Sequence, residues 1–199
     1  MAQERGWLLL TNDDGIEAVG LETLVKALHD EGYPVAVLAP SGNHSATGMR
    51  INLMKPMAYR SRDDLVERWG LNPHTTPVHL FELDGTPCDT MIVALDGGLN
   101  HLVPGVHPQM VVSGVNLGPN LSQDSYHSGT MGAAREAGLY GVPAIAASFT
   151  SFDPVGMERA VEATLDIVAA AAAVLPVKAG NLARPVSYTH LRAHETTEH

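Results

Sequence analysis

The chain has 199 residues, of which 45% are apolar and 17% charged, with a formal net charge of −10 and a single cysteine, Cys88. This length and composition are typical of one globular domain with a sizeable core. The acidic balance argues against a basic binding surface, so we expect neither a nucleic-acid polymer nor a membrane as partner. One cysteine excludes an internal disulfide, and the first residues lack a signal-peptide pattern, so we expect a cytoplasmic protein.

Strand-like and helix-like segments alternate along the chain. Short apolar runs predict buried strands at residues 7–11, 34–39, 109–113 and 143–148, with shorter strands around Ile51, Leu53 and residues 80–83. Helical spacing of apolar residues predicts helices at residues 19–29, 86–99, 129–140 and 155–175, and a helical turn at 63–69. This alternation indicates an α/β fold with a mostly parallel sheet and helices on both faces.

The last residues do not follow this pattern. Residues 186–199 have no clear apolar period and contain three of the ten histidines. They resemble translated sequencing-adapter sequence, so we expect a non-native tail at 186–199 behind a core at residues 1–185. Histidine count alone does not make a metal site, and this segment is left out of the site prediction.

The first apolar run ends abruptly in Asn12-Asp13-Asp14-Gly15. In open α/β sheets, ligands bind at the carboxyl ends of the strands, where these two acids are expected to lie. Adjacent carboxylates repel each other unless a positive charge lies between them, and a divalent cation with oxygen ligands would supply that charge. The alternative is an exposed turn, because Asn, Asp and Gly all favour turns.

Three further segments, at residues 43–48, 113–120 and 127–130, reach the same predicted edge of the sheet. They supply hydroxyls, side-chain amides and glycine backbone N–H groups, a set that suits a hard cation together with a phosphate. Asp13 and Asp14 would give the cation anionic oxygens, Asn116 a carbonyl oxygen and Ser45 a hydroxyl. The lack of a Cys or His cluster argues against structural zinc, and oxygen ligands favour magnesium, manganese or calcium.

The sequence Ser128-Gly129-Thr130 opens a predicted helix and resembles an anion cradle, because free N–H groups and the helix dipole favour phosphate there. The alternative is simple helix capping, since Ser and Thr are good caps.

Four loop residues have weaker claims to the site. Asn43 and Asn120 would contact phosphate or ribose, or else serve as turn residues. His44 and His127 are expected to be solvated or locally bonded loop histidines, although the position of His127 also makes it a candidate proton donor.

Six segments in this order resemble the signature blocks of the SurE family of survival nucleotidases: residues 12–15, 43–45, 85–89, 113–120, 128–130 and 141–148. The resemblance runs from about residue 7 to about residue 175. It implies a Rossmann-like core and metal ligation by Asp13, Asp14, Ser45 and Asn116, with one magnesium or manganese per subunit. Asp13 and Asp14 would be the catalytic residues.

The implied activity is hydrolysis of nucleoside 5′- and 3′-monophosphates to nucleoside and phosphate, with short polyphosphate as a further substrate. Members of the family are longer and form dimers or dimers of dimers. We therefore expect the carboxyl-terminal part to be missing here, and a homodimer or homotetramer where that part is intact.

Three other protein classes share parts of this pattern. A receiver-like signalling module also has an acidic pair after strand one and binds magnesium, but it normally has a phospho-accepting Asp after strand three, where this chain has Ser113. A dinucleotide-binding oxidoreductase needs Gly-x-Gly-x-x-Gly after strand one, and a haloacid dehalogenase needs Asp-x-Asp. The chain has neither sequence there, so the receiver-like module is the alternative we retain.

Overall fold

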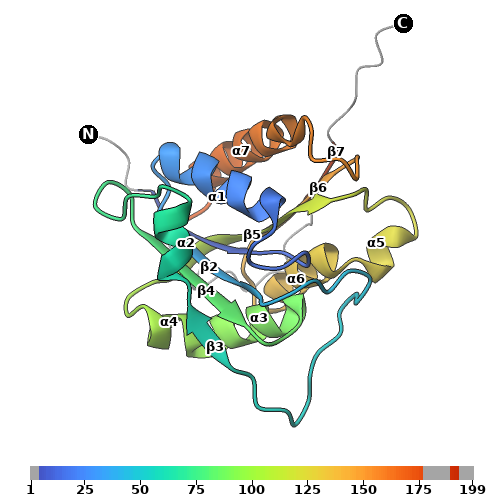
Figure 1. Ribbon diagram of the computed structural model, residues 1–199, viewed down its shortest axis with the longest axis horizontal. Coiled ribbons are helices and arrows are strands. Elements are labelled where there is room, and N and C mark those ends of the chain that lie inside the picture. Colours follow the sequence, from blue (N-terminus) through green and yellow to red (C-terminus); the bar gives the residue numbers. More distant parts are fainter. Residues whose placement is uncertain (1–4, 177–188, 193–199) are drawn as a thin grey trace, which may run out of the picture.

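The computed structural model describes residues 5–176 and the backbone of residues 189–192. Its elements alternate between strands and helices (Figure 1). In chain order they are β1 (Trp7–Thr11), α1 (Val19–Asp30), β2 (Val35–Pro40), β3 (Tyr59–Ser61), α2 (Asp63–Arg68), β4 (Val78–Leu83), α3 (Pro87–Val93), η1 (Ala94–Gly98), α4 (Leu99–Leu102), β5 (Pro108–Leu117), α5 (Asp124–His127), α6 (Gly129–Leu139), β6 (Ala144–Phe149), α7 (Met157–Val174) and β7 (Thr189–Arg192).

The strands form one sheet in the order β3-β4-β2-β1-β5-β6-β7. Every neighbouring pair is parallel except β3 and β4. The chain builds the sheet outward from β1 in one direction through β2, and in the other through β5. The loops after β1 and β5 therefore diverge, and such a switch point is where doubly wound sheets hold their ligands.

Helices cover both faces of this sheet, as the sequence predicts (Figure 1). On one face, α1, α2 and α7 bury residues such as Leu21, Trp69 and Val161 against Leu8 and Leu10 of β1. On the other face, α3, α4 and α6 bury residues such as Met91, Leu99 and Ala133, together with Leu9 of β1. Successive residues of β1 thus enter opposite cores, which explains why its first four residues are all apolar.

The structure corrects three expected element boundaries. The strands expected around Ile51 and Leu53 are wrong: both residues are exposed in a loop, because the intervening Asn52 bonds to the buried Asp89 through its Nδ2 at 2.6 Å. The single helix expected at residues 86–99 is broken by η1, where Gly97 has a left-handed φ of +100°. The strand expected at residues 109–113 continues to Leu117.

The expected tail lies largely outside the described residues. Its residues 189–192 form β7, which pairs in parallel with β6. None of the described helices is long and apolar enough to cross a bilayer.

Candidate functional site

The turn after β1 is closed by Asn12. Its Nδ2 donates to the Gly15 carbonyl at 2.8 Å, and its Oδ1 accepts from the Gly15 N–H at 3.2 Å. Gly15 has a φ of +103°, and a Cβ there would lie 3.1 Å from the Gly42 carbonyl carbon, so glycine is required. The turn fixes the two intervening residues, Asp13 and Asp14, at the carboxyl end of the central strand.

Asp13 is buried beneath the first turn of α6. The Thr130 hydroxyl donates to its Oδ1 at 2.5 Å, and the side chain is 3% exposed. A Cβ on Gly129 would lie 2.7 Å from the Asp13 Cβ, so glycine allows the helix to approach this closely. The N-terminus of α6 therefore faces the Asp13 carboxylate, an arrangement that the helix dipole stabilises.

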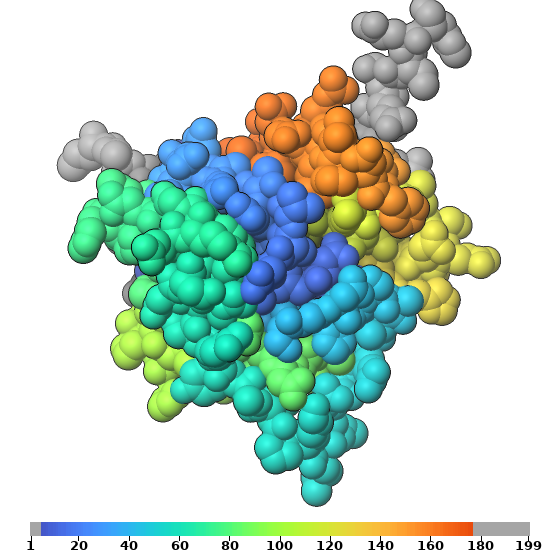
Figure 2. Space-filling view, viewed as in Figure 1, coloured from blue at the N-terminus to red at the C-terminus, as the bar shows by residue number. Residues whose placement is uncertain are grey.

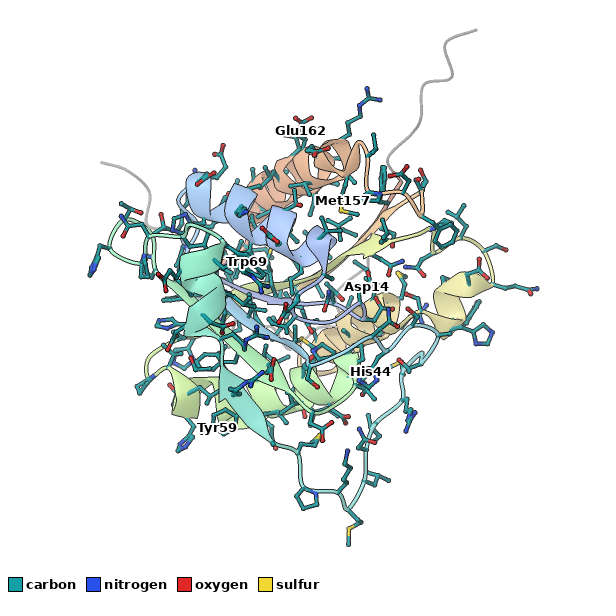
Figure 3. All side chains as sticks on the ribbon, viewed as in Figure 1. Asp14, His44, Tyr59, Trp69, Met157 and Glu162 are labelled. Atoms are coloured by element: carbon teal, nitrogen blue, oxygen red, sulfur yellow. The ribbon has the colours of Figure 1, made fainter. Side chains whose placement is uncertain are left out.

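Asp14 joins the loop that follows β2 to the last residue of β5. Its Oδ2 accepts from the Leu117 N–H at 3.1 Å, and its Oδ1 accepts from Asn43 Nδ2 at 3.4 Å. The His44 N–H also donates to the Asp13 carbonyl at 2.6 Å, so Asp14 and His44 lie close together in Figure 3. In the space-filling view, the segment after β1 (dark blue) reaches the surface between the segment after β2 (light blue) and the start of α7 (orange) (Figure 2).

The electrostatics of the two carboxylates are unfavourable in the absence of a cation. Burial raises the pKa of Asp13, and the charge of Asp14 raises it further, while the Thr130 hydrogen bond opposes both effects. Burial also raises the pKa of Asp14. Among the described residues, no ion pair includes either acid. One buried and one half-buried carboxylate, adjacent in the chain and without an ion-pair partner among the described residues, fit a divalent metal ion with oxygen ligands.

The two neutral candidate ligands lie on the segments that contact Asp14: Asn116 near the end of β5 and Ser45 in the loop after β2. The pairing of β5 with β6 shifts register between Ser113 and Asn116, just before the chain reaches Asp14. The Asn116 amide donates to the Gly118 carbonyl at 2.8 Å, which leaves its Oδ1 as a free acceptor among the described contacts. Ser45 is exposed, and its N–H donates to Asn43 Oδ1 at 2.9 Å, which holds it in the loop that contacts Asp14.

The other predicted phosphate contacts have structural partners. The Ser128 hydroxyl accepts from the Met131 N–H at 3.1 Å, so it caps α6. Asn120 Nδ2 donates to the Ser148 hydroxyl at 2.8 Å. The helix-capping alternative therefore describes Ser128, while the Thr130 hydroxyl is directed to Asp13.

The two loop histidines are bonded through their backbones. His127 is exposed, and its carbonyl accepts from the Gly48 N–H at 2.7 Å. His44 is half-buried, and its burial, followed by the charge of Arg50, lowers its pKa. No group of three or more His, Cys, Asp or Glu side chains that could hold a metal is found within residues 5–176.

Sequence reasoning missed three features of this site. The Leu117 N–H is a backbone donor, which side-chain patterns do not reveal. The Thr130–Asp13 bond joins residues 117 positions apart. A cavity of about 590 Å³ also opens beside Asp14, between the turn after β1 and the side chains of Arg60, Arg62 and Glu82. No spacing in the sequence pointed to it.

Comparison with known proteins shows the family of this chain. The model of the family "Survival protein SurE" matches residues 8–197. A protein named 5′-nucleotidase SurE from Desulfitobacterium hafniense (strain DSM 10664 / DCB-2) is 39% identical over 155 residues, which are 78% of this chain and 55% of that protein. A protein of the same name from Anaeromyxobacter sp. (strain Fw109-5) is 40% identical over 74% of this chain and 50% of its own length.

Among solved structures, the SurE protein from Aquifex aeolicus is similar, with a TM-score of 0.68 and 30% identity over 84% of this chain and 60% of that one. The chain spans about half the length of the curated relatives it matches. The order of the matched segments, the α/β fold and the family model agree: this chain belongs to the SurE family.

Proposed function

We propose that this chain forms the core of a metal-dependent 5′-nucleotidase, which hydrolyses nucleoside 5′- and 3′-monophosphates to nucleoside and phosphate. The observation that carries the proposal is the pair of adjacent carboxylates, buried Asp13 and half-buried Asp14, at the switch point of the sheet and without an ion-pair partner among the described residues. The name of the relatives, 5′-nucleotidase SurE, supports the same reaction. Short polyphosphate is a further substrate under this proposal.

The metal ligands would be Asp13, Asp14, Ser45 and Asn116, which offer only oxygen donors to one magnesium or manganese ion per subunit. A divalent cation bound there supplies Lewis-acid polarisation of a phosphoryl oxygen and lowers the pKa of water. Thr130 holds the Asp13 carboxylate in place, and the Leu117 N–H holds that of Asp14.

The substrate phosphate would lie against the first turn of α6. The Ser128 N–H is bonded to the Asp124 carbonyl at 3.0 Å and the Thr130 N–H to the Asp13 carboxylate, so of these three residues Gly129 can offer its backbone N–H, while Ser128 and Thr130 would border the phosphate. This donor, together with the helix dipole, would stabilise the charge that develops in the transition state. Asn43 and Asn120 would border the phosphate or the ribose. Asn43 would do so as part of the loop that it anchors.

The remaining expectations concern the whole protein. We infer a cytoplasmic homodimer or homotetramer that has no nucleic-acid polymer or membrane as partner. The non-native origin of residues 186–199 also stays a prediction. No contact at the site favours the receiver-like alternative, because β5 presents Ser113 and Asn116 where a receiver carries its phospho-accepting Asp.

The decisive test is phosphate release from AMP, GMP and their 3′ isomers, with manganese, magnesium or EDTA present. We expect release that depends on metal and is abolished by EDTA. Manganese binding is measured in parallel by calorimetry, with circular dichroism as the check on folding. Release that continues in EDTA, or a folded chain that binds manganese and leaves every nucleotide intact, would contradict the proposal.

A further inference from the structure

Phe152 lies in the loop between β6 and α7, with 79% of its surface exposed. Its ring is nevertheless fixed on one side by Gly118. A Cβ at Gly118 would lie 2.5 Å from the ring Cε1, 3.0 Å from Cδ1 and 3.3 Å from Cζ. Gly118 has a φ of +124°, so both its conformation and this contact require glycine. One edge of the ring thus rests on the backbone while most of the ring remains in solvent.

This ring borders the carboxylate site. Gly118 accepts a hydrogen bond from Asn116 Nδ2 at 2.8 Å, and the preceding residue, Leu117, donates its N–H to Asp14 at 3.1 Å. A single peptide unit therefore separates the backbone that binds Asp14 from the glycine that supports Phe152. Phe152 therefore packs on the residue that directly follows the Asp14-binding backbone.

Two other apolar side chains are exposed in this loop and at the start of α1. Val155, in the same loop, is 80% exposed, and Val19, at the start of α1, is 43% exposed. The first turns of α1 and α7 meet, because a Cβ at Gly20 would lie 3.3 Å from the sulfur of Met157. We call Phe152, Val155 and Val19 the apolar rim. In Figure 2 the segments that carry it, dark blue and orange, adjoin at the surface.

The opposite side of Asp14 has different chemistry. The cavity there is lined by Glu17, Glu82, Arg60 and Arg62. These charges are already paired with one another: Arg62 with Glu17 at 2.6 Å and with Glu82 at 2.8 Å, and Arg60 with Glu82 at 2.7 Å. A flat heteroaromatic ring is therefore better accommodated by the apolar rim than by this network.

We propose that Phe152 is a stacking platform for the nucleobase of the substrate; this inference rests on the proposed nucleotidase function. Every base offers a π-face, so stacking on an aromatic side chain tolerates all of them. The platform therefore predicts a preference for phosphate esters that carry a base, with little discrimination between purines and pyrimidines.

The test compares AMP with ribose 5-phosphate, which keeps the sugar phosphate and lacks the base. In Phe152→Ala, kcat/KM for AMP should fall about tenfold, mainly through KM, since a stacked base is worth that much. The value for ribose 5-phosphate should stay within about twofold. Phe152→Trp should restore AMP hydrolysis, whereas Phe152→Leu, which keeps apolar bulk, should not.

The matched control is Leu139→Ala, which removes an apolar side chain of similar exposure, 72%, at the end of α6 far along that helix from Asp13. It should leave kcat/KM unchanged for both substrates. Equal loss for AMP and ribose 5-phosphate in Phe152→Ala, or no loss for either, would overturn the platform and leave the nucleotidase proposal standing. A wild-type chain inactive on both esters would overturn the proposed function, and the platform with it.

Discussion

At the scale of single residues, Asp14 has the strongest claim to the chemistry. It is held by the Leu117 N–H, carries a raised pKa, and has no ion-pair partner among the described residues. Asp14→Asn keeps the shape and removes the charge, so turnover should fall by about a hundredfold or more, as on loss of a key electrostatic group. Phosphate release from AMP in saturating manganese is the measurement.

The control for this substitution is Asp30→Asn, which removes a largely exposed carboxylate at the end of α1. It should leave turnover unchanged. A rate near that of the wild type for Asp14→Asn would remove Asp14 from the proposed metal site.

The buried Thr130 hydroxyl donates its hydrogen bond to Asp13. Its hydroxyl favours the ionised carboxylate, so Thr130→Val should raise the pKa of Asp13 further. The acid limb of the pH–rate profile should then move to higher pH, and manganese affinity or turnover should fall by about 10–100-fold, as on loss of a contact that orients a metal ligand.

Thr130→Ser keeps the hydroxyl and is the conservative control, with a profile like that of the wild type. If Thr130→Val lowers the rate equally at every pH and binds manganese normally, its role is packing alone.

At the scale of elements, α3 shows how local sequence determines a boundary. Thr86 and Asp89 form a reciprocal capping box, with Pro87 at the first helical position. Thr86→Ala removes the cap and should cost about 1 kcal/mol, a fall in Tm of about 2–4 °C for a chain of this size. Thermal unfolding followed by circular dichroism measures it. Thr86→Ser should retain the wild-type Tm, and an unchanged Tm for Thr86→Ala would mean that packing alone defines this helix start.

The same local signals explain which elements the sequence could predict. β1 and β2 are apolar runs buried on both faces, and helix α1 shows clear apolar spacing, so they are found where they were expected. The exposed strand β3 has no apolar pattern, and its place depends on antiparallel pairing with β4. The break at Gly97 also escaped prediction, because apolar residues continue on both sides of it.

The candidate site was predictable to a similar degree. The sequence predicts that Asp13, Asp14 and the loop at Asn43 lie at one edge of the sheet, because each follows a predicted parallel strand and the carboxyl ends of parallel strands lie at the same edge. The pairings within that edge were not predictable, because the Leu117 N–H and the Thr130 hydroxyl reach the two acids only through the packing of β5 and α6 against β1.

At the scale of the whole molecule, the fold holds two adjacent carboxylates that have hydrogen-bond donors but no ion-pair partner among the described residues, and its stability should reflect this. Burial raises the pKa of Asp13 above its unfolded value, so the ionised group destabilises the folded chain at neutral pH. Asp13→Asn should therefore raise the Tm in EDTA, by about 2–4 °C for each kcal/mol relieved, while abolishing metal-dependent activity. This gain in Tm should shrink as the pH falls through the pKa of Asp13 in the folded chain, because Asp13 of the wild type then becomes neutral as well.

Manganese should stabilise the wild type more than Asp13→Asn. A ligand that binds only the folded state stabilises it in proportion to the logarithm of its concentration over Kd, so manganese should raise the Tm of the wild type with increasing concentration. Asp13→Asn, which lacks one anionic ligand, should respond weakly, and Asp30→Asn should respond like the wild type. Differential scanning calorimetry across pH 5–8, with EDTA or graded manganese, measures both effects. An Asp13→Asn chain less stable than the wild type in EDTA would mean that the Thr130–Asp13 bond outweighs the burial of the charge, and that the two acids need no cation to be accommodated.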